Sequence, residues 1–221
     1  ARLREVNSSG VKVELFTAEA NLAAKEQLPV LVESWLDAGR DWSNWGPSVQ
    51  LGFVDLFRRY SRRSELPEAT RQRISSSLGR YFPSGDRELD SVLAGVLLEL
   101  DPGKAVGKTL TLLGESLQPA RRLHYLHQLR NSKAGWTPEG RRTYLESLAA
   151  RRAFLGGRGM PQALKNIERD FLASLGAAER EGLEELIGRE AALPPLHDLS
   201  GRSLVKEWRV EDFKAAEGSD P

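Results

Sequence analysis

The sequence predicts an all-α fold of stacked antiparallel helical hairpins. Apolar residues recur at helical spacing along most of the chain, the joints between them are short, and alternating strand patterns are scarce. The expected helices are roughly 12 to 16 residues long, and hairpins of this length are typical of HEAT-like α-solenoids, in which each hairpin buries its apolar face against its neighbours. Because the repeat is degenerate in sequence, an irregular helical bundle is the alternative.

The N-terminal segment is expected to be irregular over residues 1–16, with one short strand over 11–16 (VKVELF). Thr17 is expected to cap the first helix. A helical repeat-like domain is expected over 17–190. Residues 191–221 have the composition of a linker or tail, and the polar start of the chain suggests a processed piece of a longer protein or an excised domain.

The first half of the helical domain shows three apolar stripes separated by turn residues. Pro29 either kinks the first of these helices or starts a new one. Residues 37–47 form a loop, whose Trp42 and Trp45 are either a contact surface or a local hydrophobic staple. The stripes consist of Leu28, Leu31, Val32 and Trp35, then Phe53, Val54 and Phe57, then Ile74, Leu78, Tyr81 and Phe82.

The clearest helix covers 86–100, where six apolar residues share one wide face and Asp-Pro-Gly ends the pattern. A helix with Val106, Leu110 and Leu113 follows, and another is expected over 117–130. The glycine-rich break 156–159 precedes a helix that begins near Pro161. A last helix is expected over 178–190.

The segment 123–145 connects two of these helices. On a helical wheel, Leu123, Tyr125, Leu126 and Leu129 face inwards, whereas His124 lies on the polar side. We expect His124, Arg130 and Asn131 to hydrogen-bond the turn. Trp136 is expected to cover the joint, and Thr137 caps the following helix with Pro138 at its first position.

Composition excludes several classes of function. The 32 basic and 31 acidic residues leave a net charge of +1, which argues against a dedicated nucleic-acid binder. Without cysteine the chain forms no disulfide, no thiolate zinc site and no covalently attached c-type haem. No apolar run approaches the ~20 residues of a membrane span, and no signal peptide is recognisable.

Catalytic and metal motifs have little support. His124 and His127 lie at i, i+3, but a metal site needs further ligands, and nothing pairs His197 with them. The sequence lacks a Gly-x-Ser-x-Gly elbow and a phosphate-binding loop. Carboxylates such as those of Asp86, Glu88 and Asp90 are interpreted as solvated groups in a first helical turn. We therefore expect no catalytic, cofactor-binding or metal-ligating residue.

Arginine clusters are the alternative functional signal. Arg58, Arg59, Arg62 and Arg63 are candidate anion contacts, and a helical repeat protein could grip a nucleic-acid backbone with such a face. Interspersed acidic residues favour salt bridges instead. The other arginines of this kind are Arg71, Arg73, Arg80, Arg141, Arg142, Arg151 and Arg152.

A resemblance rests on the order of features between residues 88 and 183. The points are His124-Tyr125, Leu129-Arg130-Asn131, Gly135-Trp136-Thr137, Gly156-Gly157 and Asn166-Ile167, with SLVKEWRVEDF (203–213) further on. These features resemble the helical region of large exported proteins of planctomycetes and related bacteria, where it lies between a sugar-dehydrogenase-like β-propeller and a C-terminal cytochrome c domain.

The resemblance implies a non-catalytic scaffold in a periplasmic or otherwise exported redox protein, although the sequence itself is also compatible with the cytoplasm. Its partners would be neighbouring domains or another protein. The missing Cys-x-x-Cys-His motif means that any c-type haem would belong to a downstream domain of the parent protein.

Overall fold

The structure is a computed structural model, and it describes residues 8–61, 66–152 and 159–189. The chain divides into two compact units, Ala1–Ala191 and Ala192–Pro221, and every described residue belongs to the first. Within that described part all regular structure is helical, with no strand, which confirms the all-α prediction. The expected tail and His197 lie outside the described residues.

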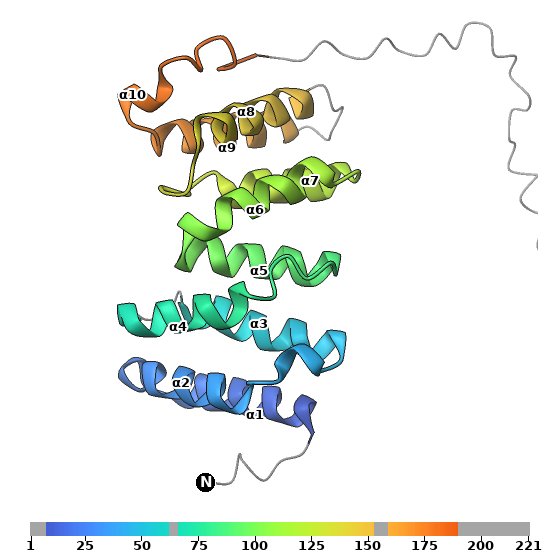
Figure 1. Cartoon of the computed structure of the whole chain (residues 1–221), viewed down its shortest axis with the longest axis vertical. Coiled ribbons are helices and arrows are strands. Elements are labelled where there is room, and N and C mark those ends of the chain that lie inside the picture. Colours follow the sequence, from blue (N-terminus) through green and yellow to red (C-terminus); the bar gives the residue numbers. More distant parts are fainter. Residues whose placement is uncertain (1–7, 62–65, 153–158, 190–221) are drawn as a thin grey trace, which may run out of the picture. The chain divides into compact units, whose positions relative to one another are not determined.

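The helices pack in successive layers of the first unit (Figure 1). Their bounds are α1 Ser9–Leu22, α2 Leu28–Ala38, α3 Pro47–Ser61, α4 Glu68–Gly79, α5 Arg87–Leu100, α6 Pro102–Glu115, α7 Pro119–Leu129, α8 Pro138–Arg152, α9 Met160–Ala173 and α10 Ala177–Arg180. Two short 3₁₀ helices cover Lys25–Gln27 and Trp42–Asn44.

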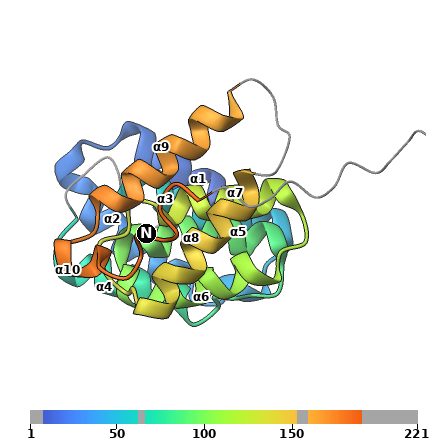
Figure 2. The same ribbon diagram turned by 90° about the horizontal axis from the view of Figure 1, so that it is seen from above.

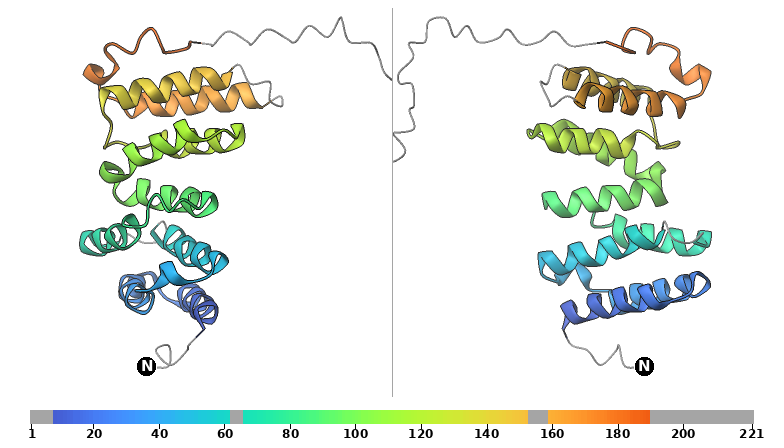
Figure 3. Two further views of the ribbon diagram at one scale, coloured as in Figure 1. Left: turned by 45° about the vertical axis from the view of Figure 1, so that its right-hand side comes forward. Right: turned by 180° about the vertical axis from the view of Figure 1, so that it is seen from behind.

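The odd-numbered helices form one row, in which α1 contacts α3, α3 contacts α5, α5 contacts α7 and α7 contacts α9. The even-numbered helices lie beside this row, with contacts between α2 and α4 and between α6 and α8. Two further views show the same layering (Figure 3), and the view from above shows the helices of different layers superposed (Figure 2). Contacts therefore join mainly neighbours in sequence, as in a stacked repeat.

Proline and capping residues fix where the central helices begin. Asp86 Oδ1 accepts hydrogen bonds of 2.9 Å from the amides of Glu88 and Leu89, which satisfies two free donors at the start of α5. Pro102 and Pro119 occupy the first turns of α6 and α7, and Pro29 likewise starts α2 rather than kinking a longer helix.

The N-terminal expectation was wrong. Residues 11–16 are part of α1, which begins at Ser9, so residues 9–16 are neither irregular nor a strand. Val13 and Phe16 are buried in the core, and this packing outweighs the strand preference of the β-branched residues. Thr17 lies inside the helix, where its hydroxyl donates to the carbonyl of Val13 at 2.8 Å.

The last helix was also predicted too long. α10 covers one turn only, and residues 181–188 continue as turns. Gly182 has a φ of 81°, a left-handed conformation that interrupts an α-helix at this point. The segment still packs against the core through Leu183 and Leu186, which are buried.

The tryptophans of the 37–47 loop belong to the core. Trp42 is 1% exposed and packs edge-on against Tyr81, with ring centroids 5.0 Å apart. Trp45 is partly buried and contacts Phe53 edge-on at 5.2 Å. Of the two alternatives left by the sequence, the local hydrophobic contact is therefore correct.

Candidate functional site

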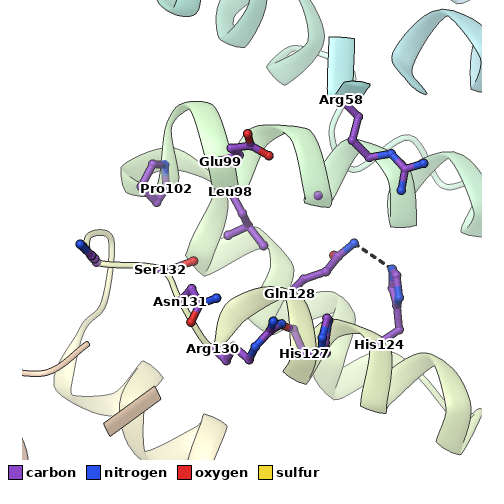
Figure 4. Close-up of a pocket in the computed structure, with 12 residues that line it drawn as sticks. Arg58, Leu98, Glu99, Pro102, His124, His127, Gln128, Arg130, Asn131 and Ser132 are labelled. Atoms are coloured by element: carbon purple, nitrogen blue, oxygen red, sulfur yellow. Dashed lines mark hydrogen bonds between the residues drawn. The ribbon is translucent and has the colours of Figure 1, made fainter. Parts of the chain in front are cut away.

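A polar groove of about 720 Å³ crosses α3, α5 and α7 (Figure 4). It contains His124, the residue on which the sequence analysis concentrated. Its lining residues are Arg58, Gly95, Leu98, Glu99, Pro102, His124, His127, Gln128, Arg130, Asn131, Ser132 and Lys133.

Helix α7 positions the two histidines on one wall. Tyr125, Leu126 and Leu129 are buried, as the helical wheel predicts, and the opposite side of the helix is therefore turned towards the groove. His124 and His127 are exposed on that side. The sequence thus predicted the orientation of α7 correctly.

Gly95 leaves room for the Gln128 side chain of α7 against α5. A Cβ atom at this position would lie only 3.1 Å from Gln128 Nε2, so even alanine would push the Gln128 side chain aside. Gln128 Nε2 donates to the carbonyl oxygen of Ser91 at 3.0 Å and contacts His124 Nε2 at 2.8 Å. Because an amide nitrogen only donates, this contact favours the His124 tautomer in which Nε2 is the acceptor.

The pKa values of both histidines are lowered from their ordinary value. Partial removal from water lowers the pKa of His124 below its ordinary value, and the charges of Arg121 and Arg58 lower it further. The pKa of His127 is lowered for the same first reason, with additional contributions from Arg130 and His124. An anion bound between them would favour the charged forms and raise both pKa values.

The cations of the groove differ in how they are paired. Arg58 donates through Nε to Asp55 at 2.7 Å, and Arg130 Nε lies 3.3 Å from Asp170. Lys133 is exposed and forms no ion pair with any described residue. The opposite wall carries Glu99, so the groove offers both signs of charge with an excess of cationic groups. Such a surface suits a polar, predominantly acidic segment of a protein.

The predicted turn contacts are correct only in part. His124 pairs with Gln128 of its own helix rather than with the turn, whereas Arg130 does donate to the carbonyl of His127 at the end of α7. Asn131 is exposed and lines the groove. Thr137 caps α8 as expected, since its hydroxyl accepts from the amide of Gly140 at 3.0 Å.

Trp136 covers the joint, as predicted, although it lies outside the groove. Its Nε1 donates to the carbonyl of Ser132 at 2.8 Å, and its ring packs edge-on against Tyr144 and Phe171. These contacts fix the turn that carries Asn131 and Lys133.

Replacing Trp136 with alanine should therefore lower the free energy of unfolding by about 3 kcal/mol, the low end for tryptophan because the ring is only half-buried. Urea denaturation followed by circular dichroism measures this loss. Leu117→Ala is the control, since Leu117 is 95% exposed and its truncation should change stability by less than about 0.5 kcal/mol. Equal stabilities of the two variants would contradict the assignment.

The arginine clusters are largely engaged in ion pairs. Arg59 shares Asp55 with Arg58, and Arg73 pairs with Glu33 and Asp37 of α2. On the C-terminal layers, the partners are Glu179 for Arg141 and Glu185 for Arg142. Arg62 and Arg63 lie outside the described residues, as do the side chains of Arg151 and Arg152 and the glycines at 156–157.

One carboxylate was misjudged. Asp90 is 3% exposed, not solvated, and its carboxylate accepts hydrogen bonds from the Ser84 amide, the Ser84 hydroxyl and the Gly85 amide. It ties the loop before α5 to the helix. Within 8–61, 66–152 and 159–189, no group of three or more His, Cys, Asp or Glu side chains is arranged to hold a metal ion.

Comparison of the chain with protein-family models, with curated proteins and with solved structures finds no match. None of the helices in the described part combines the length and the apolar character that a membrane crossing requires.

Proposed function

We propose that this chain is a non-catalytic, HEAT-like scaffold that holds a neighbouring domain or a partner protein against the groove of α3, α5 and α7. The observation that carries the proposal is the row of odd-numbered helices, in which each helix contacts the next, so that α3, α5 and α7 together line the groove. Repeat folds use such multi-layer surfaces for protein contacts.

The groove favours an acidic segment as the bound element. Lys133 is free of ion pairs with described residues, and Arg58 and Arg130 each retain donors beyond those given to their carboxylate partners. The order of features shared with the helical region of exported dehydrogenase–cytochrome c proteins supports a redox parent protein. In that setting the haem would belong to the cytochrome domain, and the compartment would be the periplasm.

Nucleic-acid binding has less support. The arginines that would contact phosphates are paired with carboxylates on α2, α3 and the segment after α9, and breaking these pairs would oppose binding. A filter-binding titration against salt separates the two functions. A steep loss of binding with rising salt would indicate phosphate contacts, and a scaffold should show almost no binding.

The scaffold proposal is tested on the native polypeptide that carries this sequence, isolated without proteolysis. A photo-crosslinking residue placed at Asn131, at the rim of the groove, should form one dominant crosslink to a segment outside residues 1–221 or to one co-purifying protein. The same residue at Lys165, an exposed position of α9 outside the groove, should not form it. Indistinguishable crosslinks from the two positions would refute the groove as a contact surface.

Intact mass of the same preparation tests the redox setting. A mass well above 24.6 kDa that includes haem is expected for an interdomain scaffold. A haem-free polypeptide near that mass would contradict the proposed redox parent protein. The scaffold proposal would then depend on the crosslinking result alone.

A further inference from the structure

Helix α1 is apolar on two opposite faces. The inner face consists of Val13, Phe16 and Ala20, which are buried. Phe16 contacts Trp35 of α2 and Phe53 of α3, with ring centroids 6.0 and 6.3 Å apart. The buried residues of α1 therefore all lie on this one face.

The outer face carries a second apolar row, the α1 outer stripe, formed by Val11, Leu15, Ala18 and Leu22. Val11, Leu15 and Leu22 are 43%, 37% and 88% exposed, and Ala18 is exposed as well. Their spacings of four, three and four residues place them along one line of the helix, as in the seam between two packed helices. A terminal helix of a stack normally has a polar outer face.

Helices α1 and α2 form the end layer of the described unit, and no other described helix lies beyond them (Figures 1 and 3). Val30, at the start of α2, is a further exposed apolar residue at 72%. Of the five large apolar side chains that are exposed in the described part, only Leu117 lies outside α1 and α2. The exposure is thus concentrated at this end.

The opposite end is covered differently. Residues 177–189 fold over α8 and α9, burying Leu183 and Leu186 and placing ion pairs to Arg141 and Arg142 outside them. Among the described residues of this end, no exposed apolar row matches the α1 outer stripe. A head-to-tail arrangement of copies is therefore disfavoured, and a closed pair in which the stripe meets itself is the arrangement that buries it.

We propose that the α1 outer stripe is the interface of a homodimer in which α1 packs antiparallel on α1 of a second copy. Charges on the flank of the stripe favour this direction. Lys12 and Glu19, seven residues apart, are both half-buried on the same flank, on opposite sides of the stripe's midpoint. Glu19 Oε2 accepts from Trp35 Nε1 at 3.0 Å, so Oε1 is the oxygen that Lys12 of a second copy would contact. In an antiparallel pair related by a two-fold axis, Lys12 of each copy comes near Glu19 of the other, whereas a parallel pair separates them.

One helix pair of about 21 Å is at the low end of the size of stable interfaces. The association is therefore concentration-dependent. Sedimentation velocity of the 221-residue chain should show a monomer at low micromolar concentration and a dimer at high micromolar concentration. Leu15→Glu should weaken the association at least tenfold, because it buries an unpaired carboxylate in the seam. Leu117→Glu is the matched control and should leave it unchanged.

Single cysteines test the direction of the pair, because the chain has none of its own. Ala18 lies close to the expected two-fold axis, so Ala18→Cys should form an intermolecular disulfide under mild oxidation. In the antiparallel pair, the two copies of Val11 are separated by about 16 Å along the helix axis, too far for the Cα distance of about 7 Å that limits a disulfide. Val11→Cys should therefore crosslink slowly.

A wild-type chain that stays monomeric at the highest concentration would overturn the proposal, and so would equal weakening by Leu15→Glu and Leu117→Glu. Crosslinking of Val11→Cys as fast as that of Ala18→Cys would overturn the antiparallel arrangement. All four positions are exposed, so each variant should melt like the wild type by circular dichroism at a low concentration, where the chain is monomeric. None of these outcomes depends on the groove or its ligand.

Discussion

Trp35→Ala should lower the free energy of unfolding by about 3–5 kcal/mol, the range for a fully buried tryptophan. Trp35 is 0% exposed and lies between Phe16 of α1 and Tyr60 of α3, with ring centroids 6.0 and 5.6 Å away. Its Nε1 also donates to Glu19 Oε2 at 3.0 Å. The substitution therefore opens a cavity at the junction of the first three helices.

Urea denaturation measures the total loss, and amide hydrogen exchange locates it. Because the helices contact mainly their neighbours, protection should fall most in α1, α2 and α3 and least in α8 and α9. Trp35→Phe keeps most of the buried volume and is the milder comparison. A loss below about 1 kcal/mol for the alanine variant, or an even fall in protection along the chain, would contradict this account.

Gly135→Ala is expected to destabilise the protein by more than about 3 kcal/mol, as a left-handed backbone and a steric clash coincide. Gly135 has a φ of 82°, and a Cβ atom there would lie 2.3 Å from the carbonyl oxygen of Pro102. The turn before α8 therefore lies directly against the backbone of Pro102 and Gly103 at the start of α6.

Gly85→Ala is the matched control for this variant. Its φ is 84°, yet a Cβ atom there has no neighbour within 4 Å, so only the backbone cost of about 1 kcal/mol applies. The difference between the two free energies of unfolding isolates the clash with Pro102. Equal effects of the two substitutions would show that the close approach contributes nothing.

The central helices could be predicted well because their signals are local. Asp86 before α5, Pro102 and Pro119 in the first turns of α6 and α7, and Thr137 before α8 each act on backbone groups a few residues away. The wheel of α7 identified the side that faces the groove for the same reason, since the buried Tyr125, Leu126 and Leu129 follow the helical period.

The errors concern residues whose environment is set by packing or by the path of a loop, which helical periodicity does not reveal. The VKVELF segment has the composition of a strand, and only its packing against α2 and α3 decides that it is helical. Asp90 has the position of a solvated carboxylate in a first turn, but the loop at Ser84 folds over it.

The groove itself was beyond prediction. Arg58 and His124 come together only through the packing of α3, α5 and α7. The one local signal is Gly95, a glycine within the strongest apolar helix, but the sequence does not show that Gln128 lies against it. Gln128, which holds His124 in one tautomer, has no sequence motif of its own.

Packing between neighbouring layers also determines how the first unit responds to mechanical force. A force applied along the stack is carried in series, through one helix interface after another, so each interface deforms slightly and the small rotations add up. Because the interfaces are loaded in series, the most easily deformed interface contributes most to the total extension. Two bodies attached to the ends of the unit would therefore stay within a defined range of separations while retaining freedom to turn relative to each other.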